Sequence, residues 1–199
     1  MHEVDKLTKI SPTQGMWLYN FCLSSKPKST LEIGMAYGYS TLYFLAALAR
    51  NQSGGHTAID PFQHPYWRGI GFTHANTYSA ATESTFRFVE DRSDRTATDL
   101  ARTNSRFDLI FIDGNHRFDD VLTDFYLYAP LCEVGGHIIF DDLWMNSIQT
   151  AVAFVRANRS DFVEMPNQHE NVSIFRKVAE DLRSWDHFQG FSVSARPTG

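Results

Sequence analysis

Residues 30–40, with the sequence TLEIGMAYGYS, decide the fold of this chain. A short apolar run ends at Gly34, and a helix-forming segment that is apolar almost all round follows over 40–50. Gly34 and Gly38 let a strand-to-helix turn approach a ligand closely, and the helix N-terminus offers free N–H groups to an anion. The glycine spacing differs from G-x-G-x-x-G, which disfavours a nicotinamide or flavin site. Glycines are equally common in turns that bind nothing.

The same alternation of strand and helix continues along the chain. Strands are predicted at 30–33, 56–59, 86–89, 107–112, 136–140, 162–165 and 172–175. Helices are predicted at 12–24, 40–50, 94–103, 118–131 and 145–158. Residues 62–77 allow no firm prediction beyond a helix that overlaps or follows their end. We therefore expect an α/β fold, a doubly wound, mostly parallel Rossmann-like sheet with helices on both faces and a terminal antiparallel strand.

Composition limits the class of protein. The 199 residues contain no long linker, so one domain is expected over 1–199. The net charge of −5, without a basic stripe, argues against nucleic acid as a partner. Cys22 and Cys132 are too few for a disulfide framework and indicate buried thiols in a reducing compartment. No apolar stretch resembles a signal peptide or spans a bilayer, so a cytoplasmic protein without a membrane partner is expected.

Polar residues follow the second and third predicted strands. Asp60 stands where a carboxylate can accept hydrogen bonds from both hydroxyls of a ribose. An Asp before Pro61 is also a common turn residue, but its spacing from the glycine turn favours the ribose role. Ser93 would either contact a base or the backbone or cap the next helix, and the cap is the more ordinary expectation.

Three carboxylates follow the fourth and fifth predicted strands: Asp113, Asp141 and Asp142. If these strands are neighbours, the carboxylates converge and raise one another's pKa unless a cation neutralises them. Three oxygen ligands with open positions suit Mg²⁺ or Mn²⁺. A turn at Asp113 or a helix cap at Asp141 would explain either group alone, but their coincidence favours a metal site. His116 is placed to take a proton from a metal-bound hydroxyl as a general base.

Together these segments resemble the class I S-adenosylmethionine-dependent methyltransferases, and more narrowly the metal-dependent small-molecule O-methyltransferases. LEIGMAYGYSTL is similar to the cofactor loop of that family, and FDLIFIDGNH followed by GGHIIFDD is similar to its metal-binding strand ends. The resemblance implies that the amino-acid part of the cofactor is held by Glu32, Gly34, Tyr39 and Ser40, with Gly38 in the same loop. It implies that Asp60 binds the ribose and that Ser93 lies near the adenine. It also implies that Mg²⁺ is bound by Asp113, Asp141 and Asp142.

The position of His116 narrows the expected acceptor. Catechol-type members have a lysine at the matching position, whereas histidine is similar to the branch that methylates sugar hydroxyls of macrolide-type natural products. We therefore expect a metal-assisted O-methyltransferase that acts on a hydroxyl of a small molecule, of the sugar or natural-product type. The same group contains proteins named for hydroxylation in cephalosporin-type pathways. A metal-dependent oxygenase or hydrolase on this scaffold and a non-catalytic binding subunit therefore stay open.

Two aromatic segments carry further expectations. Residues 63–78 either line the substrate pocket or pack as an ordinary helix. The first helix carries Trp17, Tyr19 and Phe21, and it is expected to form a lid or a contact between two copies. A homodimer would complete the pocket of a chain that has no added substrate domain.

Overall fold

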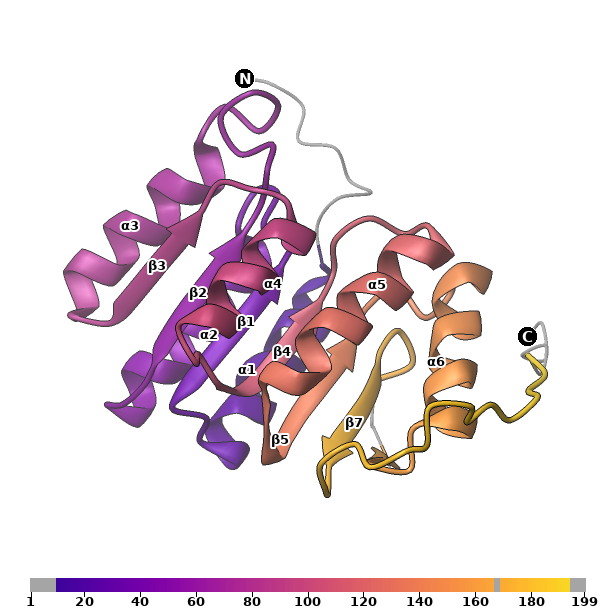
Figure 1. The fold of residues 1–199 in the computed structure, drawn as a ribbon. Coiled ribbons are helices and arrows are strands. Elements are labelled where there is room, and N and C mark those ends of the chain that lie inside the picture. Colours follow the sequence, from indigo (N-terminus) through magenta and orange to yellow (C-terminus); the bar gives the residue numbers. More distant parts are fainter. Residues whose placement is uncertain (1–9, 167–168, 194–199) are drawn as a thin grey trace.

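A seven-stranded sheet in the order β3-β2-β1-β4-β5-β7-β6 forms the middle of the computed structural model, which describes residues 10–166 and 169–193 (Figure 1). Its strands are β1 (Ser29–Ile33), β2 (Gly55–Ile59), β3 (Thr85–Val89), β4 (Phe107–Ile112), β5 (Cys132–Phe140), β6 (Phe162–Met165) and β7 (Ser173–Lys177). The first five strands pair in parallel, and β7 pairs antiparallel with both β5 and β6. The predicted doubly wound, mostly parallel sheet is confirmed.

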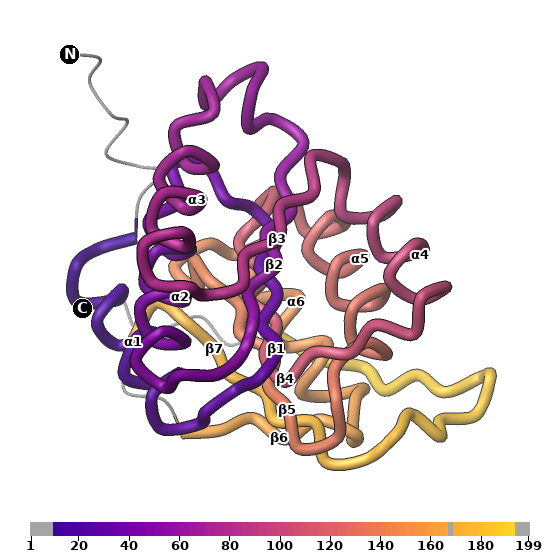
Figure 2. Tube along the Cα trace, turned by 90° about the vertical axis from the view of Figure 1, so that its left-hand side faces the viewer, coloured from indigo at the N-terminus to yellow at the C-terminus, as the bar shows by residue number. Residues whose placement is uncertain are grey.

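Helices cover both faces of the sheet. They are α1 (Pro12–Ser25), α2 (Tyr39–Asn51), α3 (Ile70–Thr82), α4 (Ser93–Arg102), α5 (Phe118–Tyr128) and α6 (Asn146–Asn158). Figure 2 shows α1, α2 and α3 on one side of the sheet and α4, α5 and α6 on the other. Each side has its own core, with Phe44 against Phe111 on the first side and Phe125 against Phe140 on the second. Among the described residues, no helix is long and apolar enough to cross a membrane.

Local sequence explains most of these elements. The hydroxyl oxygen of Ser11 accepts the N–H of Gln14 at 3.1 Å, and Pro12 opens α1 as predicted. The FDLIFI segment of β4 is buried along almost its whole length, as expected for a central parallel strand.

The predicted helix over 118–131 is wrong at its C-terminal end. The α-helix ends at Tyr128, and a short 3₁₀-helix, η1 (Ala129–Leu131), follows it. Pro130 explains the change, because it has no N–H to donate and its ring excludes a continuing α-helix. Strand β5 consequently begins at Cys132 rather than at the predicted Gly136, with an irregular register opposite Phe107 and Leu109.

The aromatic residues predicted for a lid or a dimer contact pack within the molecule. Trp17, Tyr19 and Phe21 are partly buried against the core beneath α1 and α2. The ring of Phe21 lies 5.7 Å from that of Trp17 and meets the ring of His137 edge-on at 5.2 Å. This packing accounts for the aromatic face of α1 without a second copy, and the lid and the dimer contact stay predictions.

The strand order places the candidate site. Strands β2 and β3 lie on one side of β1, whereas β4 and β5 lie on the other. The order in which successive strands are added to the sheet therefore reverses at the β1–β4 pair. In open α/β sheets, ligands bind beyond the carboxyl ends of the strands at such a switch point. The turn after β1 and the residues after β4 meet there.

Candidate functional site

The turn between β1 and α2 is shaped by two glycines. Gly34 has φ +89°, and a Cβ atom at this position would collide with the backbone oxygen of Asp113. Gly38 is the N-cap of α2 with φ +78°, and a Cβ there would lie 3.0 Å from the Cα of Gly71. Side chains at both positions are excluded by neighbouring backbone, so the turn packs closely against the residue after β4 at Gly34 and against the start of α3 at Gly38.

Asp60 fixes this turn. Its Oδ2 accepts the N–H groups of Met35 at 3.1 Å and Ala36 at 2.8 Å. Its Oδ1 accepts the N–H of Phe62 at 2.8 Å. A carboxylate has about four acceptor positions, so about one remains for another donor. The structure thus gives Asp60 a role in shaping the turn, and its contact with a ribose stays a prediction.

Glu32 and Ser40, both predicted to contact the cofactor, are bonded to each other beneath the turn. Glu32 is fully buried, and its Oε1 accepts the Ser40 hydroxyl. Its Oε2 accepts the Thr41 hydroxyl at 2.6 Å and lies 3.0 Å from Nε2 of His56. Nδ1 of His56 in turn lies 2.8 Å from the hydroxyl of Thr30. Sequence reasoning missed His56 and Thr41, because nothing in their local pattern marks them as partners of a buried carboxylate.

Tyr39 and Ser93 occupy different surroundings. Tyr39 opens α2 and is 38% exposed, so its side chain is available beside the turn. The predicted helix cap at Ser93 is wrong, because Ser93 is the first residue of α4 and Arg92 is its N-cap. The backbone oxygen of Ser93 accepts the Tyr128 hydroxyl at 2.8 Å. Burial raises the pKa of Asp124 to about 6.

The parallel pairing of β4 and β5 brings the acidic residues after these strands to one edge of the sheet. Ligand atoms of Asp113, His116 and Asp142 all lie within 4.8 Å of one another. Nε2 of His116 lies 2.8 Å from Oδ2 of Asp142 and 3.7 Å from Oδ1 of Asp113. The approach to Asp113 is too long for a hydrogen bond, and this buried nitrogen has no hydrogen-bond partner within the described chain. Two carboxylates and an unpartnered ring nitrogen fit a divalent cation.

Asp141 has a different environment from its neighbour Asp142. It is 2% exposed, and its Oδ1 accepts the side-chain amides of Gln14 at 2.5 Å and Asn171 at 3.0 Å. The N–H of Asp142 donates to the same oxygen at 2.7 Å. Sequence reasoning missed Gln14 and Asn171, which come from α1 and from the segment before β7. It also missed Trp144, which is 67% exposed and donates Nε1 to Oδ1 of Asp142 at 2.9 Å.

Burial and neighbouring charges shift the pKa values of the titratable groups at this edge. Burial raises the pKa of Asp113 to about 7, and the charge of Asp142 adds to this effect. Burial and the two neighbouring carboxylates raise the pKa of Asp141 well above its usual range. The pKa of Asp142 is lowered, because His116, Trp144 and Asn171 outweigh its burial. The carboxylates of Asp113 and then Asp142 raise the pKa of His116 to about 10. Ionised carboxylates held this close favour a bound cation.

The segment 63–78 joins the turn to α3. Gln63 is fully buried; its Nε2 donates to the backbone oxygen of Ala36 at 2.8 Å, and its Oε1 accepts the N–H of Phe72 at 3.2 Å. The ring of Trp67 packs edge-on against that of Tyr37 at 5.0 Å. The segment therefore supports the cofactor turn, and its place in the wall of a substrate pocket stays a prediction.

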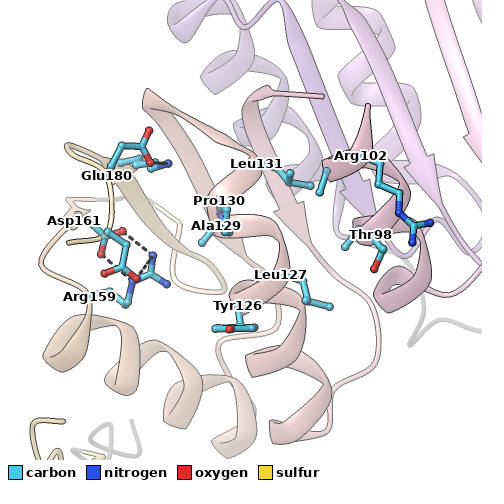
Figure 3. Close-up of a pocket in the computed structure, with 14 residues that line it drawn as sticks. Thr98, Arg102, Tyr126, Leu127, Ala129, Pro130, Leu131, Arg159, Asp161 and Glu180 are labelled. Carbon is cyan, nitrogen blue, oxygen red and sulfur yellow. Dashed lines mark hydrogen bonds and ion pairs between the residues drawn. The ribbon is translucent and has the colours of Figure 1, made fainter. Parts of the chain in front are cut away.

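Cavity size does not locate the site. A hollow of about 770 Å³ lies along the C-terminal halves of α4 and α5 (Figure 3). Its lining includes Ala101, Tyr126, Leu127 and Pro130, and none of the site residues described above lines it. The site is identified by the chemistry of its side chains at the switch point.

The comparison with known proteins agrees with this geometry. A family model described as "Methyltransferase domain" matches residues 31–143, more than half of the chain. A flavonoid 3',5'-methyltransferase of Vitis vinifera is 25% identical over 173 residues, which cover 82% of this chain and 70% of that protein. A caffeoyl-CoA O-methyltransferase of Stellaria longipes is 29% identical over 146 residues, or 69% of this chain and 56% of that protein. The resemblance inferred from the motifs is thereby confirmed.

Solved structures share the fold. The SAH-bound methyltransferase of Podospora anserina superposes with a TM-score of 0.72 at 20% identity, covering 89% of this chain and 83% of that one. The O-methyltransferase from Bacillus cereus in complex with SAH gives a TM-score of 0.69 at 18% identity, with 85% and 83% coverage.

Proposed function

Since the chain belongs to the methyltransferase family and is an S-adenosylmethionine-dependent O-methyltransferase, we propose that it methylates a hydroxyl of a small molecule. The acceptor is of the sugar or natural-product type, and a divalent cation is bound beside it. One observation carries this proposal: the backbone of Gly34 packs directly against that of Asp113. The cofactor turn and the acidic group therefore share one edge of the sheet, where a methyl donor and a cation-bound acceptor can meet. The relatives named for a flavonoid and for caffeoyl-CoA support a small-molecule acceptor.

The residues on the cofactor side have separate roles in this proposal. S-adenosylmethionine supplies a methyl group on a positively charged sulfur. The turn from Gly34 to Gly38 leaves room for its amino-acid part, whose carboxylate would meet the free N–H groups of α2. Asp60 holds the turn and offers its remaining acceptor position to the ribose. Glu32 and Ser40 fix the start of α2 from below.

Two further cofactor contacts belong to the proposal. Tyr39 is exposed beside the turn, where its side chain can cover the bound cofactor. Ser93 stands beyond the end of β3, where the adenine would lie. Both roles rest on their places at the strand ends.

The residues after β4 and β5 serve the acceptor. A bound divalent cation would lower the pKa of the acceptor hydroxyl, as it does for water. The carboxylates of Asp113 and Asp142 would hold that cation, and Trp144 stands exposed beside them. The sequence also predicts Asp141 as a ligand and His116 as the general base. The rival oxygenase, hydrolase and binding-subunit hypotheses gain nothing from the relatives found.

Two proposals concern the chain as a whole. A cytoplasmic location is supported by Cys22 and Cys132, which are both buried free thiols. A homodimer is supported by the segment after β7, which exposes 91% of Leu182 and 98% of Trp185. Arg183 donates to the backbone oxygen of Asn158 at 3.1 Å, which connects this segment to the end of α6. Tryptophan is among the commonest anchors of protein interfaces, and we place the contact between copies here rather than at α1.

Calorimetric titration with S-adenosylmethionine and with its demethylated product tests the cofactor site. Wild type should bind in the micromolar range, about −8 kcal/mol. Asp60→Asn should bind much more weakly, because one of the two oxygens that accept backbone N–H groups becomes an NH₂ donor. Asp108→Asn is the matched control, since Asp108 also accepts two backbone N–H groups, of Lys28 and Ser29, at the other end of the sheet. The absence of binding by wild type would refute the proposal, and equal losses in both variants would reject the role of Asp60.

A further inference from the structure

We infer that two copies of this chain dock reciprocally, each inserting the turn at Trp185 into the hollow between α4 and α5 of the other copy. The hollow is the one of about 770 Å³ shown in Figure 3. The arrangement rests on the proposed function, which places the contact between copies after β7, and it adds the surface that receives Trp185.

The segment after β7 is connected to the end of α6 on both sides of Trp185. Before Trp185, Arg183 donates to the backbone oxygen of Asn158 at 3.1 Å. After it, Oδ1 of Asn158 accepts the N–H of Gln189 at 2.7 Å, and Nδ2 of Asn158 donates to the backbone oxygen of Gln189 at 2.9 Å. One side chain of α6 therefore contacts both ends of a short projecting loop.

A turn displays the apolar side chains of this loop. The N–H of His187 donates to the backbone oxygen of Ser184 at 3.1 Å, so Trp185 is the second residue of a four-residue turn. Trp185 is 98% exposed, Leu182 91% and Phe188 71%. Large apolar side chains that gather in water on one face commonly mark a protein interface.

The hollow has an apolar lining and room for an indole ring. Small and aliphatic side chains of α4, α5 and η1 line most of it: Ala97, Ala101, Leu127, Ala129, Pro130 and Leu131. Clefts of about 300–1,000 Å³ typically enclose a whole small ligand, so this volume accommodates a tryptophan side chain easily. Trp185 does not fill the hollow of its own copy, because its side chain is almost fully exposed.

Charges at the two ends of the hollow give the insertion a direction. Figure 3 shows Arg102 at one end and Glu180 at the other. Asp186, which follows Trp185 in the turn, is exposed. Its carboxylate favours the end with Arg102 over the end with Glu180. The ion pair of Arg102 with Asp99, at 3.4 Å, lies at the surface, and such pairs contribute little and exchange readily.

The turn and the hollow lie close together, which suits a twofold dimer. Asp181 lines the hollow, and Trp185 follows four residues later, so their Cα atoms lie at most about 14 Å apart. A projection beside a hollow pairs with its own copy about a twofold axis. The exposed rings of Trp185, Phe188 and Tyr126 would bury up to about 450–750 Å² per copy. Together with Leu182, this approaches the roughly 800 Å² per partner of a stable interface.

This interface leaves both candidate sites open. Lys177 lines the hollow and donates Nζ to the backbone oxygen of Cys132 at 2.9 Å. Cys132 begins β5, so the hollow lies toward the end of the sheet opposite the strand ends that carry the cofactor turn. Each copy should therefore bind S-adenosylmethionine with the same affinity as a monomer or in a dimer.

Cross-linking of full-length variants with one added cysteine tests the reciprocal contact. Ser184→Cys places a thiol beside Trp185, and Ala101→Cys places one in the hollow, whereas the native thiols are buried. A short bifunctional maleimide should give about fivefold or more linked dimer in an equimolar mixture than with either variant alone. Ala81→Cys is the matched control, because Ala81 and Ala101 are both exposed next-to-last residues of helices, on opposite faces of the sheet (Figure 2). Its mixture with Ser184→Cys should not be linked.

Sedimentation velocity gives an independent measurement of the same contact. Wild type should be a dimer. Ala101→Arg, which fills the hollow, should raise the dissociation constant of the dimer about 100-fold or more, because the substitution acts at both copies of the contact. Ala81→Arg should stay dimeric, and calorimetry should show equal binding of S-adenosylmethionine by both variants.

The other outcomes overturn the docking. A wild type that is monomeric at every concentration does so, and so does a dimer that survives Ala101→Arg. If Ala101→Arg fails to fold, the small cysteine substitutions still decide, and linkage of the mixture no stronger than that of Ala101→Cys alone overturns the docking. A monomeric wild type that binds S-adenosylmethionine leaves the proposed function standing. A dimer with the expected links that binds no S-adenosylmethionine removes the proposed function and leaves the contact.

Discussion

Replacement of Gly34 by alanine tests the close packing of the cofactor turn on the end of β4. The added Cβ has two costs. A left-handed conformation costs a residue other than glycine about 1–2 kcal/mol, and Gly34 has φ +89°. The new atom also meets the backbone oxygen of Asp113, and overpacking of this kind typically costs about 1–3 kcal/mol. The two costs together predict a loss of about 2–5 kcal/mol in the free energy of unfolding.

Gly135→Ala is the matched control for this prediction. Gly135 has φ +97°, but a Cβ there would meet no atom within 4 Å. The control should therefore lose only the conformational cost, about 1–2 kcal/mol. Urea unfolding of both variants, followed by circular dichroism, gives the two losses directly. Equal losses would show that Asp113 does not constrain the turn and would refute the reasoning.

Three further perturbations follow from the same structure. Asp124→Asn removes a carboxyl whose pKa is raised to about 6 by burial. The folded wild type binds more protons than the unfolded chain between about pH 4 and 6. Its free energy of unfolding should therefore fall by about 3 kcal/mol as the pH rises through that range. Urea unfolding of the variant should show no such loss. His56→Ala should lower the free energy of unfolding by about 3–5 kcal/mol, because the ring stacks on Phe44 at 4.8 Å and is hydrogen-bonded to the buried Glu32. A loss as small as that of the exposed His64→Ala would show that His56 does not stabilise the buried carboxylate. Trp185→Ala should leave the circular dichroism spectrum of the folded chain unchanged and convert a dimer into a monomer by sedimentation velocity, and a wild type that is monomeric at every concentration would contradict the proposed contact.

Most of the fold follows from local patterns. The alternation of apolar strands and helices predicts the parallel sheet, and the FDLIFI segment predicts its buried central strand. The apolar pattern of α5 continues through Pro130 and so predicts a helix that is too long, whereas the proline ends the α-helix and η1 follows. The prediction of a helix cap at Ser93 is wrong for a related reason. A serine after a strand is a common cap, but the helix begins one residue earlier than its pattern suggests.

The sequence by itself determines which side chains stand at the strand ends, because strand and turn propensities depend on near neighbours. It therefore predicts that the glycine turn, Asp60 and the acidic residues after β4 and β5 share one edge. Only the tertiary structure decides how those side chains are used. Gln14 and Asn171 reach Asp141 from distant parts of the chain, and the unpartnered nitrogen of His116 lies beside Asp142. These contacts depend on how helices and loops pack on the sheet, and no local pattern encodes the distance between residues so far apart in the sequence.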